Sequence, residues 1–488
     1  MGHALQGGEE TGKSGMKKYG AGKLWGGRFS GRTDREFFDF QKSLDYDFRL
    51  AEFDISHSLI HIVALREAGL LNGREYTALG KALRRLLQRV RNEGPGFILR
   101  EKGAAEDIHS YIHGQVEKEA GKAALKLHTF RSRNDQVAFD EKWYCLKECA
   151  DIAGLMDALD GSLKKLSGRN RGVIFLGYTH ARRAQAITFE LYLDAFRSMF
   201  GRDRQRLGDY YDRLRVGIGA GALAGTSLGR DAYAKAVKAA VSGDRSKVVP
   251  AENSVDHVSD RDYIIELLSV LSIIQMHLSR LAEDFILYSG SEYFFLSLPE
   301  EFCTGSSLMP HKKNPDFLEL VRGNTGRVYG GLIWLLTLMK GLPLSYNRDM
   351  QLDKEPLFSA VETMKSELSL LCRFLPGVKV NAGAVKAALS DRTFYATELA
   401  EWMVREKKVP FKKAHDAAGS LIKATESSGK KIEDMTDAEL RRLHPAFNAE
   451  DIKRVMDPFY AAGGGKRAPE KKSGGVKPAG LKPPAVEL

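Results

Sequence analysis

The chain has 488 residues, of which 43% are hydrophobic and 28% are charged, and this composition is typical of a soluble globular protein with about three domains. The formal net charge is +11, but residues 1–23 (four Lys, two Glu) and 464–488 (six Lys or Arg, two Glu) account for six of these charges. The remaining chain is only mildly basic, so the charge does not indicate a nucleic-acid-binding protein. The four cysteines are too few and too scattered for a disulfide framework, which favours a reducing, cytoplasmic location.

The two ends of the chain differ in composition from the rest. Residues 1–22 and 464–488 are rich in Gly, Lys and, at the C-terminal end, Pro, so we expect both segments to be disordered. The first segment lacks the apolar core of a secretory signal. It contains GGEETGKS, which has the spacing of a phosphate-binding loop between Gly7 and Ser14. That motif acts between a buried strand and a helix, and neither is indicated here, so we do not assign phosphate binding to it.

Long stretches of helical periodicity occupy the middle of the chain. The clearest is YIIELLSVLSIIQMHLSRLAEDFILYS, where apolar residues recur every three or four positions without Gly or Pro. Its charged residues argue against a membrane span. Helices this long need packing partners along their length, so we predict an all-α helical bundle. The expected helices span residues 136–166, 188–214, 263–289, 318–339 and 354–375.

The segment EDIHSYIH places His109 and His113 one helical turn apart. Two imidazoles at this spacing can share a metal ion. No third ligand and no general-base Glu between the two histidines is evident, so the sequence favours a polar network over a metal site.

Further polar loops fall between the expected helices. KLHTFRSRND concentrates two guanidiniums, Arg131 and Arg133, beside Ser132 and Asn134, and such a group could clamp a dicarboxylate. A solvated charged turn is the alternative. LGYTHARRAQA offers His180, and a single histidine is more often structural than catalytic. GIGAGALAG lacks the dinucleotide-binding spacing and follows a helix, so we expect a close-packed turn.

The loop TGSSLMPHKKNP carries Ser306, Lys312 and Asn314 next to Gly305. A serine acts as a base only if its deprotonated form is stabilised, which a nearby Lys and clustered backbone N–H groups could do. There is no nucleophile-elbow spacing, so acyl transfer is less favoured. Considered alone, this segment could equally be a flexible linker.

Taken together, these loops resemble a known family. TGSSLMPHKKNP is similar to the G-S-S-x-M-P-x-K-x-N-P signature of the fumarase/aspartase superfamily, whose members release fumarate. Other motifs resemble the argininosuccinate lyase family in particular, in order from about residue 23 to 460. They are KLWGGRFSG (23–31), EDIH (106–109), LHTFRSRNDQVA (127–138), GYTH (177–180), GAGALAGT (219–226), SDRDY (259–263), MKGLPLSYNRDMQLDKE (339–355) and ATELAEWMVREKKVPFKKAH (396–415).

The resemblance implies an all-α, three-domain fold and a homotetramer whose active sites are each shared by three subunits. The implied boundaries follow the motifs. They are a disordered extension (1–22), an N-terminal mostly helical domain (23–131), a central long-helix bundle that forms the oligomer core (132–389), a small C-terminal helical domain (390–463) and a disordered basic tail (464–488).

The resemblance also implies a reaction, cleavage of argininosuccinate into arginine and fumarate by β-elimination, with no metal or organic cofactor. Ser306 matches the proposed base and His180 the acid/base partner, while Lys312 and Asn314 match groups that hold the developing charge. The sequence does not decide which of Ser306 and His180 removes the proton and which supplies one. The matching substrate contacts are Ser132, Arg133 and Asn134 for the fumarate carboxylates, Thr179 beside His180, Ser43, Tyr346, Gln351 and Lys354 for the arginine half, and Arg261 and His109 as supporting residues.

Several positions depart from the family pattern. Phe130 stands where the family has Gly in H-T-G-R-S-R-N-D, and a benzyl group could block the carboxylate site if that position requires positive φ. Arg182, Leu176, Ala186, Tyr111, His113 and Leu352 also differ from the usual residues. Two alternatives therefore stay open: another fumarate-releasing lyase, acting on adenylosuccinate, aspartate or malate, and a lyase scaffold that Phe130 makes catalytically impaired.

Overall fold

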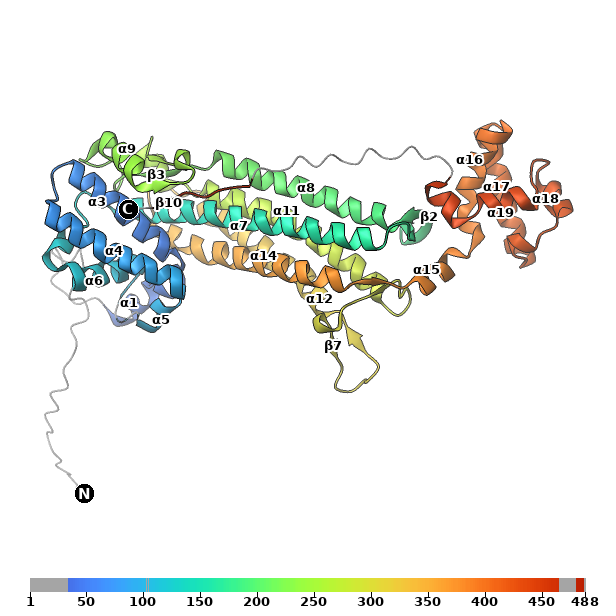
Figure 1. Ribbon diagram of the computed structural model, residues 1–488, viewed down its shortest axis with the longest axis horizontal. Helices are drawn as coiled ribbons and strands as arrows, with labels where there is room; N and C mark the ends of the chain where they lie inside the picture. The colour runs from blue at the N-terminus through green and yellow to red at the C-terminus, as the bar shows by residue number, and fades with distance from the viewer. Residues whose placement is uncertain (1–33, 102, 104, 465–479, 487–488) are drawn as a thin grey trace, which may run out of the picture.

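The computed structural model describes residues 34–101, 103, 105–464 and 480–486. It is an elongated molecule in which a long helical bundle joins a helical region at each end (Figure 1). The fold is all-α, which confirms the prediction, since every sheet among the described residues has only two strands. The predicted disorder of residues 1–22, the GGEETGKS segment and the KLWGGRFSG motif all lie outside the described residues.

The N-terminal region is a layer of helices around α3, which is buried over most of its length because α4, α6, α7 and α9 all contact it. Side-chain caps fix where these helices begin: Asn72 and Glu75 form a capping box at α4, and Asp107 accepts the Ser110 N–H at α6. The helices are α1 (Arg35–Gln41), α2 (Leu44–Asp47), α3 (Ala51–Glu67), α4 (Gly73–Glu93), α5 (Phe97–Glu101) and α6 (Ile108–Ala120).

The bundle consists of the long helices that the sequence predicts, with one correction. The expected helix over 318–339 is two helices that meet at Asn324, whose backbone stays near helical values (φ −64°, ψ −11°) and whose side chain donates to the buried Glu367 carboxylate. The central helix α11 is long and apolar enough to cross a membrane by length and composition alone. It contacts every other bundle helix, so we interpret it as the core helix. The bundle comprises α7 (Arg133–Arg169), α8 (Phe189–Arg213), α11 (Asp262–Ser289), α12 (Asp316–Gly323), α13 (Thr325–Met339) and α14 (Lys354–Phe374).

Short strands and two small helices connect the bundle helices. Most of the strands lie near an end of the bundle, where they shape the loops (Figure 1). The pairs are β1 (Ile174–Thr179) with β2 (Arg182–Thr188), β3 (Val216–Ile218) with β5 (Val248–Pro250), β4 (Val241–Ser242) with β10 (Ala485–Val486), β6 (Leu296–Ser297) with β9 (Lys379–Val380), and β7 (Thr304–Gly305) with β8 (Lys313–Asn314); the helices are α9 (Gly229–Ala240) and α10 (Ser254–Ser259).

The C-terminal helices gather at the opposite end of the bundle from the N-terminal region (Figure 1). They are α15 (Ala382–Leu389), α16 (Ala396–Lys407), α17 (Phe411–Ser428), α18 (Asp437–Leu443) and α19 (Ala449–Val455). The prediction of disorder over 464–488 is wrong for residues 480–486. They return to the N-terminal region and form β10, because Val486 buries its side chain there and β4 offers an unpaired strand edge.

Candidate active site

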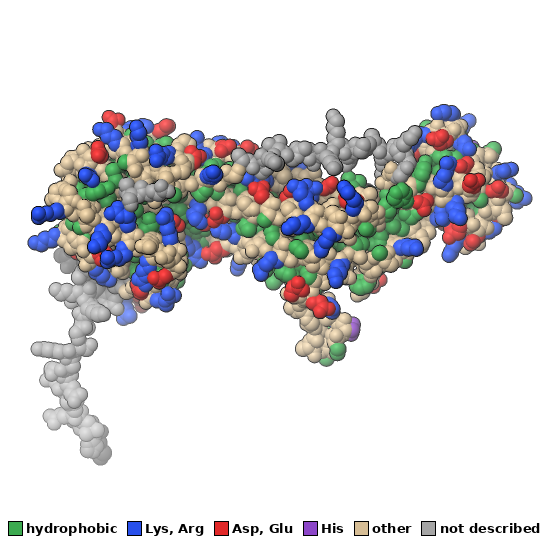
Figure 2. All heavy atoms as spheres, in the orientation of Figure 1, with side chains coloured by type: hydrophobic (Ala, Val, Ile, Leu, Met, Phe, Trp, Pro, Cys, Tyr) green, Lys and Arg blue, Asp and Glu red, His purple; other side chains and the backbone are tan. Residues whose placement is uncertain are grey.

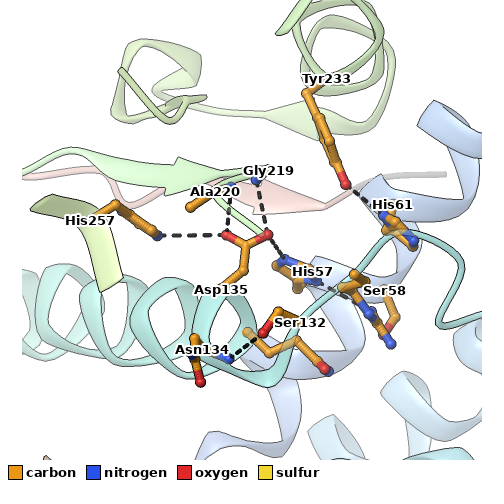
Figure 3. A network of polar contacts seen from close by, with 12 residues as sticks. His57, Ser58, His61, Ser132, Asn134, Asp135, Gly219, Ala220, Tyr233 and His257 are labelled. Carbon is orange, nitrogen blue, oxygen red and sulfur yellow. Dashed lines mark hydrogen bonds and ion pairs between the residues drawn. The ribbon is translucent and has the colours of Figure 1, made fainter. Parts of the chain in front are cut away.

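Three of the predicted carboxylate-binding residues lie at the start of α7 (Figure 3). Ser132 is the N-cap residue, and its hydroxyl accepts the Asn134 backbone N–H at 3.2 Å. Arg133 forms an ion pair with Asp107 and donates to the Ser110 hydroxyl at 2.8 Å. Unpaired backbone N–H groups and the helix dipole favour an anion at such a terminus. The arrangement suits a carboxylate, with hydroxyl, guanidinium and amide groups on the first turn.

The next residue, Asp135, connects the start of α7 to the glycine-rich segment. Its buried carboxylate accepts the N–H groups of Gly219 and Ala220, each at 3.1 Å (Figure 3). Burial would raise the pKa of Asp135, but the neighbouring His57 and His257 and the Ala220 N–H outweigh burial and lower it. Asp135 therefore stays ionised and anchors the loop.

The glycine-rich segment is the close-packed turn that the sequence predicts. Gly219 has φ +85° and Gly221 has φ +63°, a region that strongly favours glycine. A Cβ at position 219 would lie 2.6 Å from the Tyr233 ring. The same turn brings the Ala222 carbonyl within 3.2 Å of the Asn134 amide nitrogen, which donates to it.

Of the two arginines considered for a carboxylate clamp, Arg131 turns toward α3. Its guanidinium donates to the Ser58 hydroxyl at 2.8 Å and lies 3.3 Å from ring nitrogens of His57 and His128. Burial lowers the pKa of Arg131. Only Arg133 keeps a guanidinium beside Ser132 and Asn134, and Arg131 fixes the loop that precedes them.

Phe130 adopts the left-handed backbone conformation that the family glycine suggests, with φ +59°. A bulky residue at this φ is strained. The side chain is 50% exposed, two residues before Ser132. Packing therefore does not account for the strain.

The predicted residues Ser43 and His109 belong to a buried network beside this helix start. Ser43 donates to the Asp47 carboxylate at 2.6 Å, and Asp47 also accepts the Ile108 N–H at 3.1 Å. Burial and the nearby Asp107 raise the pKa of Asp47 to about 7. The network joins the segment after α1 to the EDIH motif, because the Ser43 N–H also donates to the Glu106 carbonyl at 3.0 Å.

His109 lies 3.0 Å from the Asp54 carboxylate through its Nδ1. Burial would lower the pKa of His109, but Asp54 outweighs it and raises the pKa above the usual value. Asp54, His109 and Asp140 offer three ligand atoms within 4.8 Å of one another, so they are the described residues that could hold a metal ion. The Asp54–His109 contact already satisfies two of these groups, and we route no reaction step through a metal. His113 instead packs against the His128 ring, with the ring centroids 4.7 Å apart.

The predicted residues for the arginine half lie close to the same end of the bundle. Gln351 donates to the Gln41 carbonyl at 3.0 Å and to the Tyr46 hydroxyl at 3.2 Å, so it faces the segment that holds Ser43. Tyr346 lies five residues earlier, and burial raises its pKa. Both side chains are partly exposed.

Arg261 and Lys354 are buried together with two carboxylates. The Lys354 ammonium lies 2.6 Å from Glu141 and 2.9 Å from Asp353, and Arg261 lies 2.6 Å from Asp353 and 3.1 Å from Glu141. Burial would lower the pKa of Lys354, but the two carboxylates outweigh it and raise it. Both cations are therefore charged and neutralised inside the chain. Their predicted contact with substrate stays a prediction, and here they fix the segment before α14.

Thr179 and His180 lie at the tip of the β1–β2 hairpin, and both are exposed. His180 and Ala181 form a two-residue loop with φ +53° and +57°, the geometry of a tight hairpin turn. Arg183 donates to the Ala388 carbonyl at 3.1 Å and ties the hairpin to the C-terminal helices. The imidazole therefore points out from the end of the bundle that is remote from Ser132.

Ser306 lies on the loop between β7 and β8, which stands clear of the bundle (Figures 1 and 2). Its hydroxyl oxygen accepts the N–H groups of Leu308 at 3.3 Å and Met309 at 3.0 Å. Two backbone donors on one oxygen favour its deprotonated form. Lys312 is exposed on the same loop and Asn314 lies at its base.

One chain thus keeps the predicted residues in three separate groups: those near the start of α7, those at the tip of the β1–β2 hairpin and those on the β7–β8 loop. The helix α7 alone separates Ser132 from the β1–β2 hairpin by about 55 Å, at 1.5 Å per residue over its 37 residues. The β7–β8 loop projects from the side of the bundle (Figure 1). A reaction that uses Ser306, His180 and Ser132 together therefore requires more than one chain.

Two residues that support the start of α7, Asp135 and His57, had no role predicted from the sequence, and Arg131 had a different one. Asp135, His57 and Arg131 build the support under the start of α7, as Figure 3 shows for the first two. Asp135 directly follows the predicted contacts, which was the available signal. His57 and His61 sit one turn apart on α3, but nothing local to that helix connects them to residue 135.

Comparison with known proteins agrees with the motifs. A family model described as "Lyase" matches residues 27–330, and one described as "Argininosuccinate lyase C-terminal" matches residues 393–461. Argininosuccinate lyase from Carboxydothermus hydrogenoformans is 43% identical over 431 residues, which is 88% of this chain and 92% of the relative. The enzyme of that name from Geobacter sulfurreducens is 43% identical over 448 residues, covering 91% and 95% of the two chains.

Solved structures share the fold at lower identity. An EDDS lyase in complex with formate has a TM-score of 0.69 and 22% identity, covering 88% of this chain and 86% of its own. A class II fumarase from Schistosoma mansoni has a TM-score of 0.69 and 16% identity, covering 85% and 91%. The relatives and the two matched family models together show that the chain belongs to the argininosuccinate lyase family of the fumarase/aspartase superfamily.

Proposed function

We propose that the protein cleaves argininosuccinate by β-elimination into L-arginine and fumarate, at sites that each combine loops from three chains. The family relationship supports the substrate, because relatives at 43% identity over most of the chain carry that activity in their name. It also disfavours adenylosuccinate, aspartate or malate as the substrate. The observation that carries the mechanism is the Ser306 oxygen, which accepts two backbone N–H groups on a loop that also bears Lys312.

Ser306 takes the role of the base. The proton to be removed sits on the carbon next to a carboxylate of the succinate half, and it is only weakly acidic. The N–H groups of Leu308 and Met309 stabilise the serine alkoxide that removes it. The electrons of the broken C–H bond pass into that carboxylate and form a doubly charged aci-carboxylate. Fixed positive and N–H groups must hold this charge before the C–N bond breaks, and Lys312 with Asn314 are placed on the loop to do so.

His180 takes the role of the acid. The C–N bond electrons leave with the arginine guanidino group, which departs protonated. An exposed imidazole at a hairpin tip can approach another chain and supply that proton, with Thr179 beside it as a substrate contact.

The start of α7 holds the fumarate carboxylates in this proposal, through Ser132, Arg133 and Asn134. Tyr346 and Gln351 lie at the neighbouring surface and, with the buried Ser43, receive the arginine half, while Lys354, Arg261 and His109 keep that surface in place. The three residue groups of one chain then serve three different sites. A homotetramer of paired bundles is the assembly that we propose for this sharing.

We also propose a cytoplasmic location and no nucleic-acid partner. All four cysteines are free and two of them are buried, which suits a reducing compartment. The small-molecule substrate needs no basic surface of the kind that nucleic acid requires.

Mixing two inactive variants tests the shared site. We expect Ser306→Ala and His180→Asn each to lack fumarate production from argininosuccinate, followed by ultraviolet absorbance. After the two tetramers are dissociated, mixed and reassembled, some sites receive an intact Ser306 and an intact His180, so activity should return. If both residues served the site within one chain, every mixed site would stay defective. An absence of recovery in tetramers shown to be mixed would therefore overturn the shared site.

A substrate panel tests the reaction itself. The wild-type protein should release fumarate from argininosuccinate and not from adenylosuccinate, aspartate or malate. Release from adenylosuccinate alone would overturn the assignment. An absence of release from any of them, together with no gain in Phe130→Gly, would indicate an impaired scaffold.

A further inference from the structure

The C-terminal segment 480–486 is seated on the N-terminal region, far from the C-terminal helices that precede it (Figure 1). Its strand β10 pairs antiparallel with β4, with Val486 opposite Val241 and Ala485 opposite Ser242. The Ser242 hydroxyl donates to the Ala485 carbonyl at 3.4 Å, which reinforces the strand pairing. Tyr211, near the end of α8, donates its hydroxyl to the Lys482 carbonyl at 2.6 Å. The segment is thus held by main-chain and side-chain hydrogen bonds at both of its ends.

The side chains of the segment alternate in burial as an inserted strand requires. Pro484 and Val486 are buried, whereas Ala485 between them is partly exposed, which is the two-residue period of a strand with one face covered. Leu481 packs against the edge of the hydrophobic core, and Lys482 is exposed. The two buried positions indicate a groove that takes the alternate side chains at 484 and 486.

The receiving surface is shaped for a close approach of backbone. Gly243, which follows β4, has φ +73°, and a Cβ there would lie 3.1 Å from the Pro483 carbonyl oxygen. Tyr211 is held by Lys247, whose ammonium lies 4.5 Å from the centre of the Tyr211 ring and donates to the Tyr211 carbonyl at 2.6 Å. The glycine makes room for the segment, and the lysine fixes the tyrosine that captures its carbonyl.

We propose that the edge of β4 together with Tyr211 is a binding site for an extended, proline-containing peptide, and that residues 481–486 are its intramolecular ligand. Addition of a strand to an exposed edge gives affinity through main-chain hydrogen bonds, and alternate side chains give specificity. The prolines at 483 and 484 restrict the free segment, so less conformational freedom is lost on docking.

The bound segment straps the C-terminal helices to the N-terminal region. The segment also covers the edge of β4, the strand that comes before β5 in the chain. β5 pairs with β3, and the residues that follow β3, Gly219 and Ala220, donate the N–H groups that hold Asp135. The strap therefore supports the backbone behind the start of α7.

A disulfide trap tests the docking in the full-length protein. Ala485 and Ser242 are direct cross-strand partners, and such pairs lie at the Cα separation that a disulfide requires. We expect Ser242→Cys with Ala485→Cys to form a bond within one chain upon mild oxidation, seen on a non-reducing denaturing gel and by peptide mass. The single variants are the controls, because Cys303 and Cys372 are not fully buried. Absence of the bond, or a bond between two chains, would overturn the proposal.

A peptide added in trans tests the site. A variant that ends at Gly480 should bind a fluorescent peptide of residues 481–488, LKPPAVEL, in a saturable manner measured by anisotropy. A second peptide with the Val486→Asp change should bind at least tenfold more weakly than the unchanged peptide, because a charge would enter the buried position. The full-length protein should bind the unchanged peptide at least tenfold more weakly than the truncated variant, since its own segment occupies the site. Equal binding to both proteins, or none to the truncated one, contradicts the proposal, and neither readout depends on catalysis.

Discussion

The start of α7 and the β7–β8 loop both carry predicted substrate contacts, yet they are built in opposite ways. Around α7, the buried Asp135 and His57 and the half-buried Arg131 lie behind the contacts and hold them in place. The β7–β8 loop has almost nothing beneath it: Leu308 is 84% exposed, and Ser306 bonds only to the backbone of its own loop. The first region takes its supporting contacts from the same chain, whereas the Ser306 hydroxyl in the second region has hydrogen bonds only to neighbouring residues of its own surface loop.

The difference shows where the chain places rigidity. Binding of carboxylates depends on fixed geometry, so a helix start supported by buried charges suits the groups that we propose to bind them. Ser306 and His180, the residues that we propose to transfer protons, lie on surface turns. Four substitutions probe this contrast, in order of decreasing expected effect.

Removing the Ser306 hydroxyl should have the largest effect. We expect Ser306→Ala to lower the rate of fumarate release by roughly a hundredfold to ten-thousandfold, the usual contribution of a positioned acid or base. Sedimentation should show an unchanged oligomer, because the loop is exposed. Ser307→Ala is the matched control, with an expected change below about threefold. Retention of full activity in Ser306→Ala would end its assignment as the base.

Breaking the buried charge cluster should mainly affect stability. Lys354→Met leaves Glu141 and Asp353 buried with one cation fewer, and loss of one partner from a buried pair costs about 3–5 kcal/mol. Urea unfolding at fixed protein concentration measures this loss. Lys164→Met is the control: its ammonium contacts Asp160 at the surface, where such pairs contribute about 0–1 kcal/mol. Equal losses in both variants would contradict the distinction between the supported and the exposed regions.

The Asp47 carboxyl should give the protein a measurable pH dependence. Its pKa of about 7 in the folded chain exceeds the value of about 4 in the unfolded chain. The folded state therefore binds this proton more tightly, so its contribution to stability is complete below about pH 4 and is lost as the pH rises to about 7. Asp47→Asn keeps the contacts to Ser43 and Ile108 without the charge.

We expect the free energy of unfolding to fall between pH 5 and pH 8 by about 2–3 kcal/mol more in the wild type than in Asp47→Asn, at 1.36 kcal/mol per pKa unit. Urea unfolding at the two pH values provides the comparison. Asp349→Asn changes an exposed carboxylate and should leave the pH dependence as it is. Parallel curves for wild type and Asp47→Asn would show that this carboxyl is ionised in the folded protein.

Replacing Phe130 should have the smallest effect on stability. Phe130→Gly relieves the left-handed strain, which costs about 1–2 kcal/mol, but gains freedom in the unfolded chain, so we expect a net change below about 1 kcal/mol. A thermal melt measures it. Phe130→Ala removes the ring and keeps the strain, so it should be the less stable of the two. Higher activity in both variants than in wild type would show that the ring obstructs the carboxylate site.

The sequence alone determined the bundle and the chemistry of the loops. Helical periodicity is a local property, so the five helices could be placed from residue spacing, and they differ from the structure mainly in that one of them is two shorter helices meeting at Asn324. The motif order around Ser306, His180 and Ser132 indicated the family, which the relatives confirm. The positive φ suspected at Phe130 followed from the glycine that the family keeps there, and the structure confirms it.

Only the tertiary structure decided which groups support the site and which way they face. Arg131 and Arg133 are alike in sequence, but Arg131 contacts His57, Ser58 and His128, whereas Arg133 contacts Asp107 and Ser110. Lys354 is predicted as a substrate contact, and its ion pair with Glu141, more than two hundred residues away, is visible only in the folded chain. Composition predicts disorder for the last residues, yet Val486 docks because a strand edge far from it in the chain is free to pair. These outcomes depend on contacts between distant segments, and a local pattern of residues does not contain them.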